Sequence, residues 1–294
     1  MSKEAQRARP NAIEVALRDA LEWSIQRWVT WSGRKEWAAE APWLEGPAGE
    51  EHIGAEFYEA YVRETGLEAV TDDEDAGLLP SFDALASESF DPSLVRPEIR
   101  DFYERTARYG FSVRISWSGP FRHPPRTLIY LAGRNVGQFD IPLSAPSVIM
   151  ENELIHLQDP ATNETPYAGW LRRSAATEEA MLAGLYTVCE LPLERGRFFK
   201  GVYPLPGGSA TTIFRPENRP DGSLALVSDG RRFGEAGYYR IHRTESGALR
   251  VKRVPIEEAI HVFVDHWGAL HAHHIFALWK ARFLTLRYGI SRRG

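Results

Sequence analysis

The sequence holds 294 residues, of which 43% are hydrophobic, 12% aromatic and 26% charged. That apolar share is ordinary for a packed globular protein, and it excludes wholesale disorder and the fibrous classes. The 35 basic and 40 acidic side chains leave a net charge of -5, so the chain has no overall basic field that would attract nucleic acid.

Neither a membrane span nor a secretion signal is predicted. The longest apolar runs, such as 127–133, fall far short of the ~20 residues that a spanning helix needs. The first residues carry charges throughout and lack the apolar core of a signal peptide. The single cysteine, Cys189, allows no internal disulfide. Together these features predict a cytoplasmic protein that binds neither membranes nor nucleic acid.

The first third of the chain, from Asn11 to about Tyr109, is predicted to be mostly helical. Between residues 12 and 43, apolar side chains recur every three or four positions, which gives a helix one broad apolar face. Two further helices are predicted at 55–64 and 97–109. Such helices would cover one face or one end of the structure that follows them.

Five of the nine tryptophans lie between Trp23 and Trp43. One interpretation is that they anchor the helical segment on the main body of the protein. The other is that they form an aromatic wall around a flat ligand, or an interface with a partner, because large aromatic side chains dominate such contacts. Both interpretations stay open.

Residues 68–91 contain eight carboxylates and no lysine or arginine. Such a charge block is usually a solvated loop, so an acidic linker is predicted there. The linker belongs to a helical cover segment, 1–110, and a β-rich body follows at 111–294. Because the cover segment has too few apolar stretches to be self-sufficient, the two parts are predicted to form one composite domain.

From Gly110 onward the pattern changes to the alternation that is typical of strands. The predicted strands are 112–117, 147–157, 168–173, 181–191, 198–203, 210–214, 224–227, 238–243, 249–254, 260–265 and 270–278, with one helix at 127–139. Turn residues separate them, and no nucleotide-binding glycine loop appears among them. The prediction is an α+β protein with a large antiparallel sheet of about ten strands, barrel-like or a sandwich, covered by the N-terminal helices.

Five of the nine histidines fall within fourteen residues, on two alternating runs joined by a glycine-containing turn. This arrangement predicts a hairpin. A loop centred on Trp267 and Gly268 would place His261 opposite His274, with Cβ atoms ~5 Å apart. A slip of one residue would instead place His261 opposite His273, or Asp265 opposite His271.

The hairpin supplies the candidate catalytic residues, because histidines near a carboxylate can transfer protons near neutral pH. The catalytic candidates are His261, His274 and Asp265, and the ligand-contact candidates are His271, His273, Glu151, Glu153 and Trp117. The alternative is that these histidines lie on a solvated face and have a structural role. A third metal ligand in a fixed position is missing, so no metal residues are assigned.

A β-barrel of about eight to ten strands can enclose a small ligand, so the predicted fold favours a small-molecule site. The function predicted first is therefore the binding of an apolar or aromatic molecule, with acid/base chemistry in a pocket of the β-rich body. Arg172 and Arg173 form a small basic spot that could anchor a carboxylate or phosphate. The alternatives are a non-catalytic scaffold that uses the tryptophan-rich helices, and a metalloprotein centred on His261 and His274. The cofactor is left unknown, and a homo-oligomer is compatible with the sequence.

Overall fold

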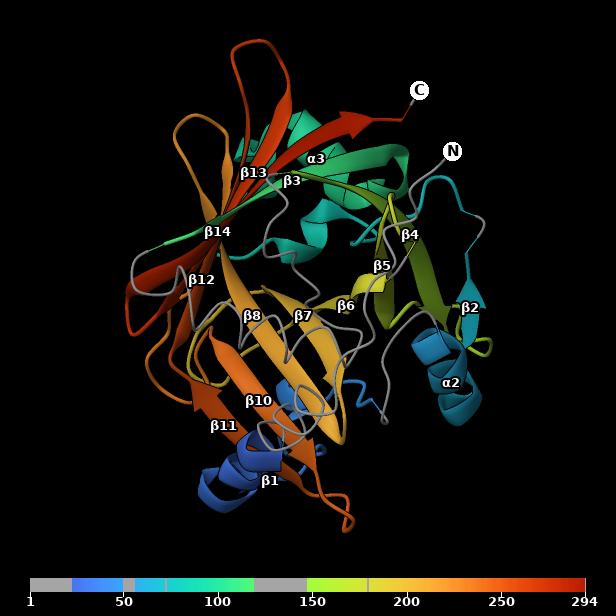
Figure 1. Cartoon of the computed structure of the whole chain (residues 1–294), viewed down its shortest axis with the longest axis vertical. Helices are drawn as coiled ribbons and strands as arrows, with labels where there is room; N and C mark the ends of the chain where they lie inside the picture. The colour runs from blue at the N-terminus through green and yellow to red at the C-terminus, as the bar shows by residue number, and fades with distance from the viewer. Residues whose placement is uncertain (1–22, 50–55, 72, 119–146, 179, 294) are drawn as a thin grey trace, which may run out of the picture.

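The computed structural model of the chain describes residues 23–49, 56–71, 73–118, 147–178 and 180–293. Within these residues, fourteen strands form one antiparallel sheet, and ten of them close into a barrel (Figure 1). The predicted α+β fold with a large, barrel-like antiparallel sheet is therefore confirmed.

The barrel follows the chain order for most of its circumference. The ring runs through β8 (Gly208–Asn218), β7 (Phe198–Leu205), β6 (Ala180–Cys189), β5 (Tyr167–Ser174), β4 (Val148–Gln158), β3 (Tyr109–Trp117), β14 (Ala281–Arg292), β13 (Leu270–Leu278), β12 (Ile256–Val264) and β9 (Leu224–Ser228), and returns to β8. Two pairings depart from the chain order, because β14 pairs with β3 and β12 pairs with β9.

The remaining described strands lie outside the ring. β10 (Tyr238–Arg243) pairs with β8, and β11 (Leu249–Val254) and β1 (Arg34–Glu36) follow outward from it. β2 (Glu68–Val70) adds to the free part of β4. Because β8 pairs with β10 along 208–212 and with β9 along 215–218, the sheet forks at this strand.

Alternation along the strands separates a packed interior from an outer wall. On β3, Phe111 and Val113 are buried in the main core cluster, whereas Ser112 and Arg114 between and beyond them are exposed. On β7 every residue is buried, because the outer face is covered there as well. Side chains two residues apart on a regular stretch of strand still share one face, so the parity tells which of them enter the barrel.

Short helical elements close one end of the barrel. They are α3 (Pro97–Glu104) and the turns η2 (Phe82–Leu85), η3 (Pro92–Leu94) and η4 (Thr106–Arg108). The rings of Phe102 and Phe111 lie 5.7 Å apart between centroids, as do those of Tyr103 and Phe199. Aromatic side chains of this cap therefore pack directly on inward-facing residues of the strands.

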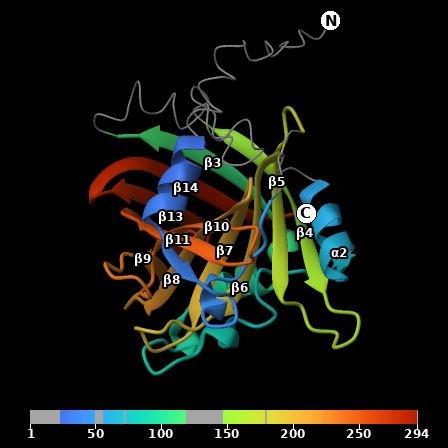
Figure 2. The ribbon, with the colours of Figure 1, turned by 90° about the horizontal axis from the view of Figure 1, so that it is seen from below.

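The helix α2 (Glu56–Thr65) packs instead on the outer wall, beside β4 (Figure 2). The hydroxyl of Tyr58 donates a hydrogen bond to the carbonyl oxygen of Gly184 at 3.0 Å. A Cβ atom on Gly169 would lie 2.6 Å from the Tyr58 ring, so a glycine at that position is what lets α2 approach the sheet closely.

The first third of the chain is less helical than predicted. Residues 23–32, α2 and α3 are helical as expected, but β1, β2 and four short turns, the first being η1 (Pro42–Leu44), fill much of the described remainder. Prolines at 42, 47, 80 and 92 interrupt the helical pattern because they lack a backbone N–H. The helix predicted at 127–139 lies outside the described residues.

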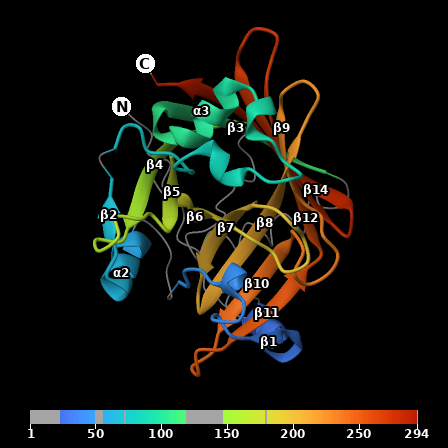
Figure 3. The ribbon, with the colours of Figure 1, turned by 180° about the vertical axis from the view of Figure 1, so that it is seen from behind.

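The acidic segment 68–91 contributes to the core. Its apolar side chains Leu79, Phe82, Leu85 and Phe90 are fully buried in the main cluster at the capped end of the barrel. Figure 3 shows this end from behind, with α3 in the upper part of the view near β3. The described carboxylates of the segment are exposed, so its charged side chains face solvent while its apolar side chains enter the core. The division into a cover and a body stays a prediction.

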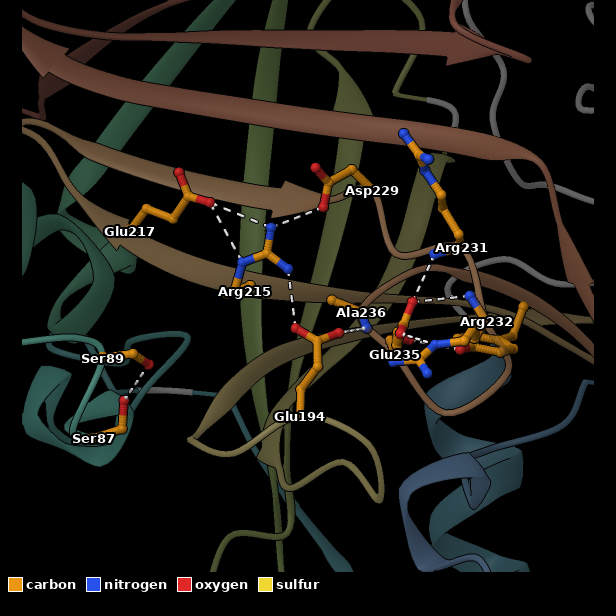
Figure 4. Close-up of polar contacts among 11 residues, drawn as sticks. Ser87, Ser89, Glu194, Arg215, Glu217, Asp229, Arg231, Arg232, Glu235 and Ala236 are labelled. Atoms are coloured by element: carbon orange, nitrogen blue, oxygen red, sulfur yellow. Dashed lines mark hydrogen bonds and ion pairs between the residues drawn. The ribbon is translucent and has the colours of Figure 1, made fainter.

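The barrel closes between β8 and β9 through four residue pairs, and an ion-pair cluster stands beside this seam (Figure 4). The guanidinium of Arg215 on β8 lies 2.8 Å from Asp229, 3.0 Å from Glu194 and 3.4 Å from Glu217. Three carboxylates from different segments thus contact one guanidinium, and these charge-assisted hydrogen bonds join the segments beside the seam.

Candidate functional site

The β12–β13 hairpin has a register one residue away from the one predicted first. His261 pairs with His273, not with His274, and Val264 pairs with Leu270. The amide of Asp265 donates to the carbonyl oxygen of Ala269, so the loop has three residues. A three-residue loop needs a left-handed residue at its third position, and Gly268 supplies it with φ +84°.

This register separates the two histidines that were predicted to act together. His261 lies on the outer wall, while His274 has the parity of the buried Ala272 and Val262 and faces the interior. Two side chains on opposite faces of one sheet cannot hold the same ion or share a proton. The predicted pair of His261 and His274, and the metalloprotein hypothesis built on it, are therefore wrong.

The outer face of the hairpin carries a cluster of rings, in which Phe263 stacks on His261 and His271 and meets His273 edge-on. The ring of Phe263 lies 5.0 Å from His261, 5.5 Å from His271 and 5.0 Å from His273 between centroids. Nε2 of His261 lies 2.8 Å from Oγ of Ser223. Desolvation lowers the pKa of His261 and His273 below the ordinary histidine value, and Arg287 adds to this for His273.

Asp265 has a mainly structural role in the turn. Its carboxylate accepts the backbone N–H groups of Trp267 and Ala269 at 2.9 and 2.8 Å, and Nε2 of His271 lies 3.0 Å from its second oxygen. The hydrogen bond from Ala269 is the largest cause of a lowered pKa of Asp265. The carboxylate is thus held ionised as a cap of the loop.

Inside the barrel, His274 has a partner that the sequence reasoning missed. Its Nε2 lies 2.8 Å from Oε2 of Glu258, and the other carboxylate oxygen accepts the hydroxyl of Thr212 at 2.8 Å. The side chains of Glu258 and His274 are 3% and 12% exposed. A buried carboxylate–imidazole pair of this kind can donate or accept a proton.

Three buried N–H donors on the inner face of β4 and β5 have no acceptor among the residues that the structure describes. Asn152 and Arg172 are direct cross-strand neighbours, and Trp170 shares the face of Arg172 two residues before it. Among the described residues, Nδ2 of Asn152, Nε of Arg172 and Nε1 of Trp170 have no hydrogen-bond partner. Arg293 donates to Oδ1 of Asn152 at 2.9 Å, which fixes the orientation of this amide.

Arg172 is enclosed by aromatic side chains. Its guanidinium lies 4.2 Å from the centre of the Trp170 ring and donates from Nη2 to the hydroxyl of Tyr186 at 2.8 Å. The hydroxyl of Tyr203 lies 3.4 Å from that of Tyr186. Burial raises the pKa of Tyr288 to about 12 and that of Tyr203 well above its usual value. These phenols therefore stay neutral, and no described carboxylate forms an ion pair with Arg172.

Trp117, a predicted ligand-contact residue, also has the inward parity of β3. Its indole Nε1 is buried and has no hydrogen-bond partner among the residues that the structure describes. The indole N–H is a donor only, so this nitrogen can be satisfied by an acceptor alone. Within the described residues, the unpartnered buried side-chain atoms that face the barrel interior are thus mostly donors.

The two predicted glutamates of β4 lie on the outer wall. Glu153 forms an ion pair with Arg173 at 3.3 Å. Glu151 lines an open groove of about 710 Å³ that also contains His271, Asn152 and Arg293. Glu151 and His271 are thus brought to one surface groove, away from the interior pair of Glu258 and His274.

Cys189 does not have the environment of a nucleophile. Burial raises its pKa to about 11, so the thiol is protonated at neutral pH. The described residues also contain no group of three or more histidine, cysteine, aspartate or glutamate side chains that could hold a metal ion.

Alternation along the predicted strand 168–173 could have revealed part of the interior site. Trp170 and Arg172 are two positions apart and therefore lie on the same face of the strand. Leu171 between them lies on the other face and packs against α2. Glu258 left no such signal, because the strand was predicted to begin at 260, whereas β12 begins at Ile256.

Comparisons with known proteins give one informative similarity. No family model matches the chain, and no solved structure matches it. The chain is similar to the uncharacterized membrane protein YndJ of Bacillus subtilis (strain 168), with 27% identity over 247 residues. The alignment covers 83% of the chain and 42% of YndJ, so the chain spans less than half of that relative. In the described part of the chain, no helix has both the length and the apolar character to cross a membrane.

Proposed function

We propose that this chain binds a small, largely apolar or aromatic carboxylate inside the barrel. The observation that carries the proposal is the group of buried donors on Asn152, Trp170 and Arg172 that lack acceptors among the described residues. A buried donor left without a partner costs about 1–3 kcal/mol. Native proteins keep few such groups, and a ligand oxygen that accepts from them removes this cost.

The charge of Arg172 favours an anionic group on the ligand. A guanidinium stays protonated at any physiological pH, and its described polar contact is with the neutral hydroxyl of Tyr186. A carboxylate would form charge-assisted hydrogen bonds there, which are roughly twice as strong as neutral ones. The rings of Trp170, Tyr186 and Phe111 beside it favour an apolar or aromatic remainder.

The pair of Glu258 and His274 is proposed to exchange a proton with the bound molecule. Tyr203 extends the contacts of Arg172 through the interior, because its hydroxyl lies 3.4 Å from that of Tyr186, which accepts a hydrogen bond from Arg172. Burial raises the pKa of Tyr203, and the charge of Glu258 adds to this. A ligand anchored at Arg172 would therefore lie within the same polar interior as the acid/base pair. The location in the cytoplasm and a homo-oligomeric state stay predictions.

The binding proposal is tested with isothermal titration calorimetry. The probes are benzoate, indole-3-acetate and decanoate, each with its primary amide as the uncharged control. We expect at least one carboxylate to bind, its amide to bind about tenfold more weakly, and Arg172→Met to weaken the carboxylate by at least about tenfold. Arg173→Met is the matched control, because Arg173 lies on the outer wall, and it should bind like the wild type.

Native mass spectrometry of the freshly purified protein complements the titration, because a molecule retained from the host would be seen directly. The proposal fails if no co-purified molecule is seen and none of the three carboxylates binds, or if Arg172→Met binds like the wild type. The acid/base part is tested separately by NMR of histidine-labelled protein. A His274 signal that does not change when the carboxylate binds would contradict it.

A further inference from the structure

Four of the five tryptophans in the N-terminal cluster are exposed. Trp23, Trp28, Trp31 and Trp37 are 60%, 40%, 85% and 42% exposed, whereas Trp43 is buried against Tyr239. Exposed indole rings gathered in one short segment are unusual, because a tryptophan loses favourable burial at the surface. The segment therefore does not serve mainly to anchor the N-terminal part on the barrel.

Cationic side chains alternate with these rings. The guanidinium of Arg27 lies 5.1 Å from the centre of the Trp23 ring, and the ammonium of Lys35 lies 4.8 Å from that of Trp37. Lys252 of β11 lies 5.4 Å from the ring of Trp28. In the same segment Glu36 is paired with Arg34 at 3.4 Å, so its charge is partly balanced.

The sheet outside the ring extends this basic character. Lys35 on β1 is paired with Arg250 on β11, and Lys252 is paired with Arg240 on β10. Directly paired residues share one face of a sheet. The buried Leu249 and Val251 occupy the opposite face, so the basic residues lie on the face away from that core.

The tryptophan segment is held firmly on this sheet. Arg250 donates from Nη1 to the carbonyl oxygen of Gly33 at 3.4 Å, and Nζ of Lys252 donates to that of Ser32 at 3.3 Å. Val29 is buried, and Gln26 donates to the carbonyl oxygen of Pro206 at 3.0 Å. Figure 1 shows this helical segment beside β1 and β11, at the end of the molecule opposite to α3. The exposed rings therefore have a fixed direction.

We infer that this tryptophan-rich basic surface docks on a phospholipid bilayer that contains anionic lipids. Indole rings prefer the boundary between headgroups and acyl chains, and nearby lysine and arginine side chains are attracted to anionic headgroups, each by about a fivefold change in binding. The charge complementarity selects an anionic surface over a neutral one. Surface docking requires no spanning helix, so this inference departs from the prediction, made from the short apolar runs, that the protein binds no membrane.

Vesicle co-sedimentation of the full chain tests this inference. The probes are vesicles of phosphatidylcholine alone and vesicles with 30% phosphatidylglycerol. We expect binding to the anionic vesicles, a fall of about tenfold for the double variant Trp23→Ser/Trp31→Ser, and a larger fall, of about 25-fold or more, for Lys35→Glu/Lys252→Glu. Trp267→Ser/Trp279→Ser is the matched control, because these two rings are 81% and 74% exposed on hairpin turns elsewhere, and it should bind like the wild type.

Quenching of wild-type tryptophan fluorescence by brominated lipids gives a readout that does not depend on variant folding, and we expect quenching by anionic vesicles. Equal binding to neutral and anionic vesicles, no binding to either, or an equal loss in the control variant would overturn the inference. So would a dimer in light scattering that Trp23→Ser/Trp31→Ser dissociates while vesicle binding is absent, since the surface would then be a protein interface.

Discussion

The β12–β13 hairpin carries two histidine–carboxylate pairs of nearly equal length on its opposite faces. Inside the barrel, His274 lies 2.8 Å from Glu258, and on the outside His271 lies 3.0 Å from Asp265. The inner carboxylate is 3% exposed and the outer one 18% exposed. The same two residue types thus form a buried acid/base pair on one face and a turn cap on the other.

The difference shows that burial, and not the type or spacing of the residues, separates a candidate site from a structural contact. Water screens the outer pair and replaces any hydrogen bond that is lost there. In the interior, a polar group that loses its partner stays unsatisfied. The consequences of substitution should therefore differ strongly between the two faces.

Replacement of the inner carboxylate should have the largest effect on stability. Glu258→Ala leaves the hydroxyl of Thr212 and the ring of His274 without their partner in the interior, and we expect a loss of about 3 kcal/mol in the free energy of unfolding. Urea denaturation followed by circular dichroism measures it. Asp265→Ala removes the carboxylate of the outer pair, and its loss in the free energy of unfolding should be clearly smaller. Equal losses for the two variants would remove the distinction between the faces.

The three-residue loop between β12 and β13 fixes their register, and thereby which side chains face the interior. Substitution in this loop should have the next largest effect on stability. Gly268 adopts φ +84°, and no atom lies within 4 Å of the position that a Cβ would occupy. Gly268→Ala therefore introduces backbone strain without a clash, and we expect a loss of about 1 kcal/mol. Thermal unfolding measures the loss. An unchanged melting temperature would mean that the left-handed residue is not what holds the three-residue loop.

The pH dependence of the outer histidines should be the smallest effect. The pKa values of His261 and His273 are lowered in the folded state, so the unfolded chain binds more protons below the ordinary histidine pKa of about 6.5. Their contribution to stability is present above that pH and decreases as the pH falls through the unfolded pKa towards the folded one. His261→Gln and His273→Gln should each flatten the curve between pH 7.5 and 5. A curve that keeps its slope in both variants would contradict this assignment.

The bounds of several strands follow from local alternation, although β14 was not among the predicted strands, and partners across space do not follow from it. β10, β11 and β13 begin and end at the residues predicted from the sequence. The register of the hairpin depended on whether its loop has two, three or four residues, and the choice rests on the hydrogen bonds of Asp265 and the left-handed Gly268. That information is three-dimensional, and a slip of one residue moved His274 to the other face.

Most of the interior site lies beyond sequence reasoning for a related reason. Arg172 was noted as a basic spot, but its importance comes from the enclosure by Trp170 and Tyr186, which lie on two strands that meet in the folded barrel. Glu258 and Thr212 are 46 positions apart and meet across the interior. A linear pattern indicates which residues point inward, but it does not show which of them face one another.

The order of the strands also governs how the protein can be made. β3 obtains its second neighbour from β14, through nine pairs that run from Leu284 with Trp117 to Arg292 with Tyr109. During synthesis one edge of β3 therefore stays unpaired until β14, and with it nearly all of the described chain, has left the ribosome. Such long-range pairing is slow, and an unpaired edge invites association with other chains. A nascent chain that stops before β14 should depend on chaperones far more than the finished barrel does.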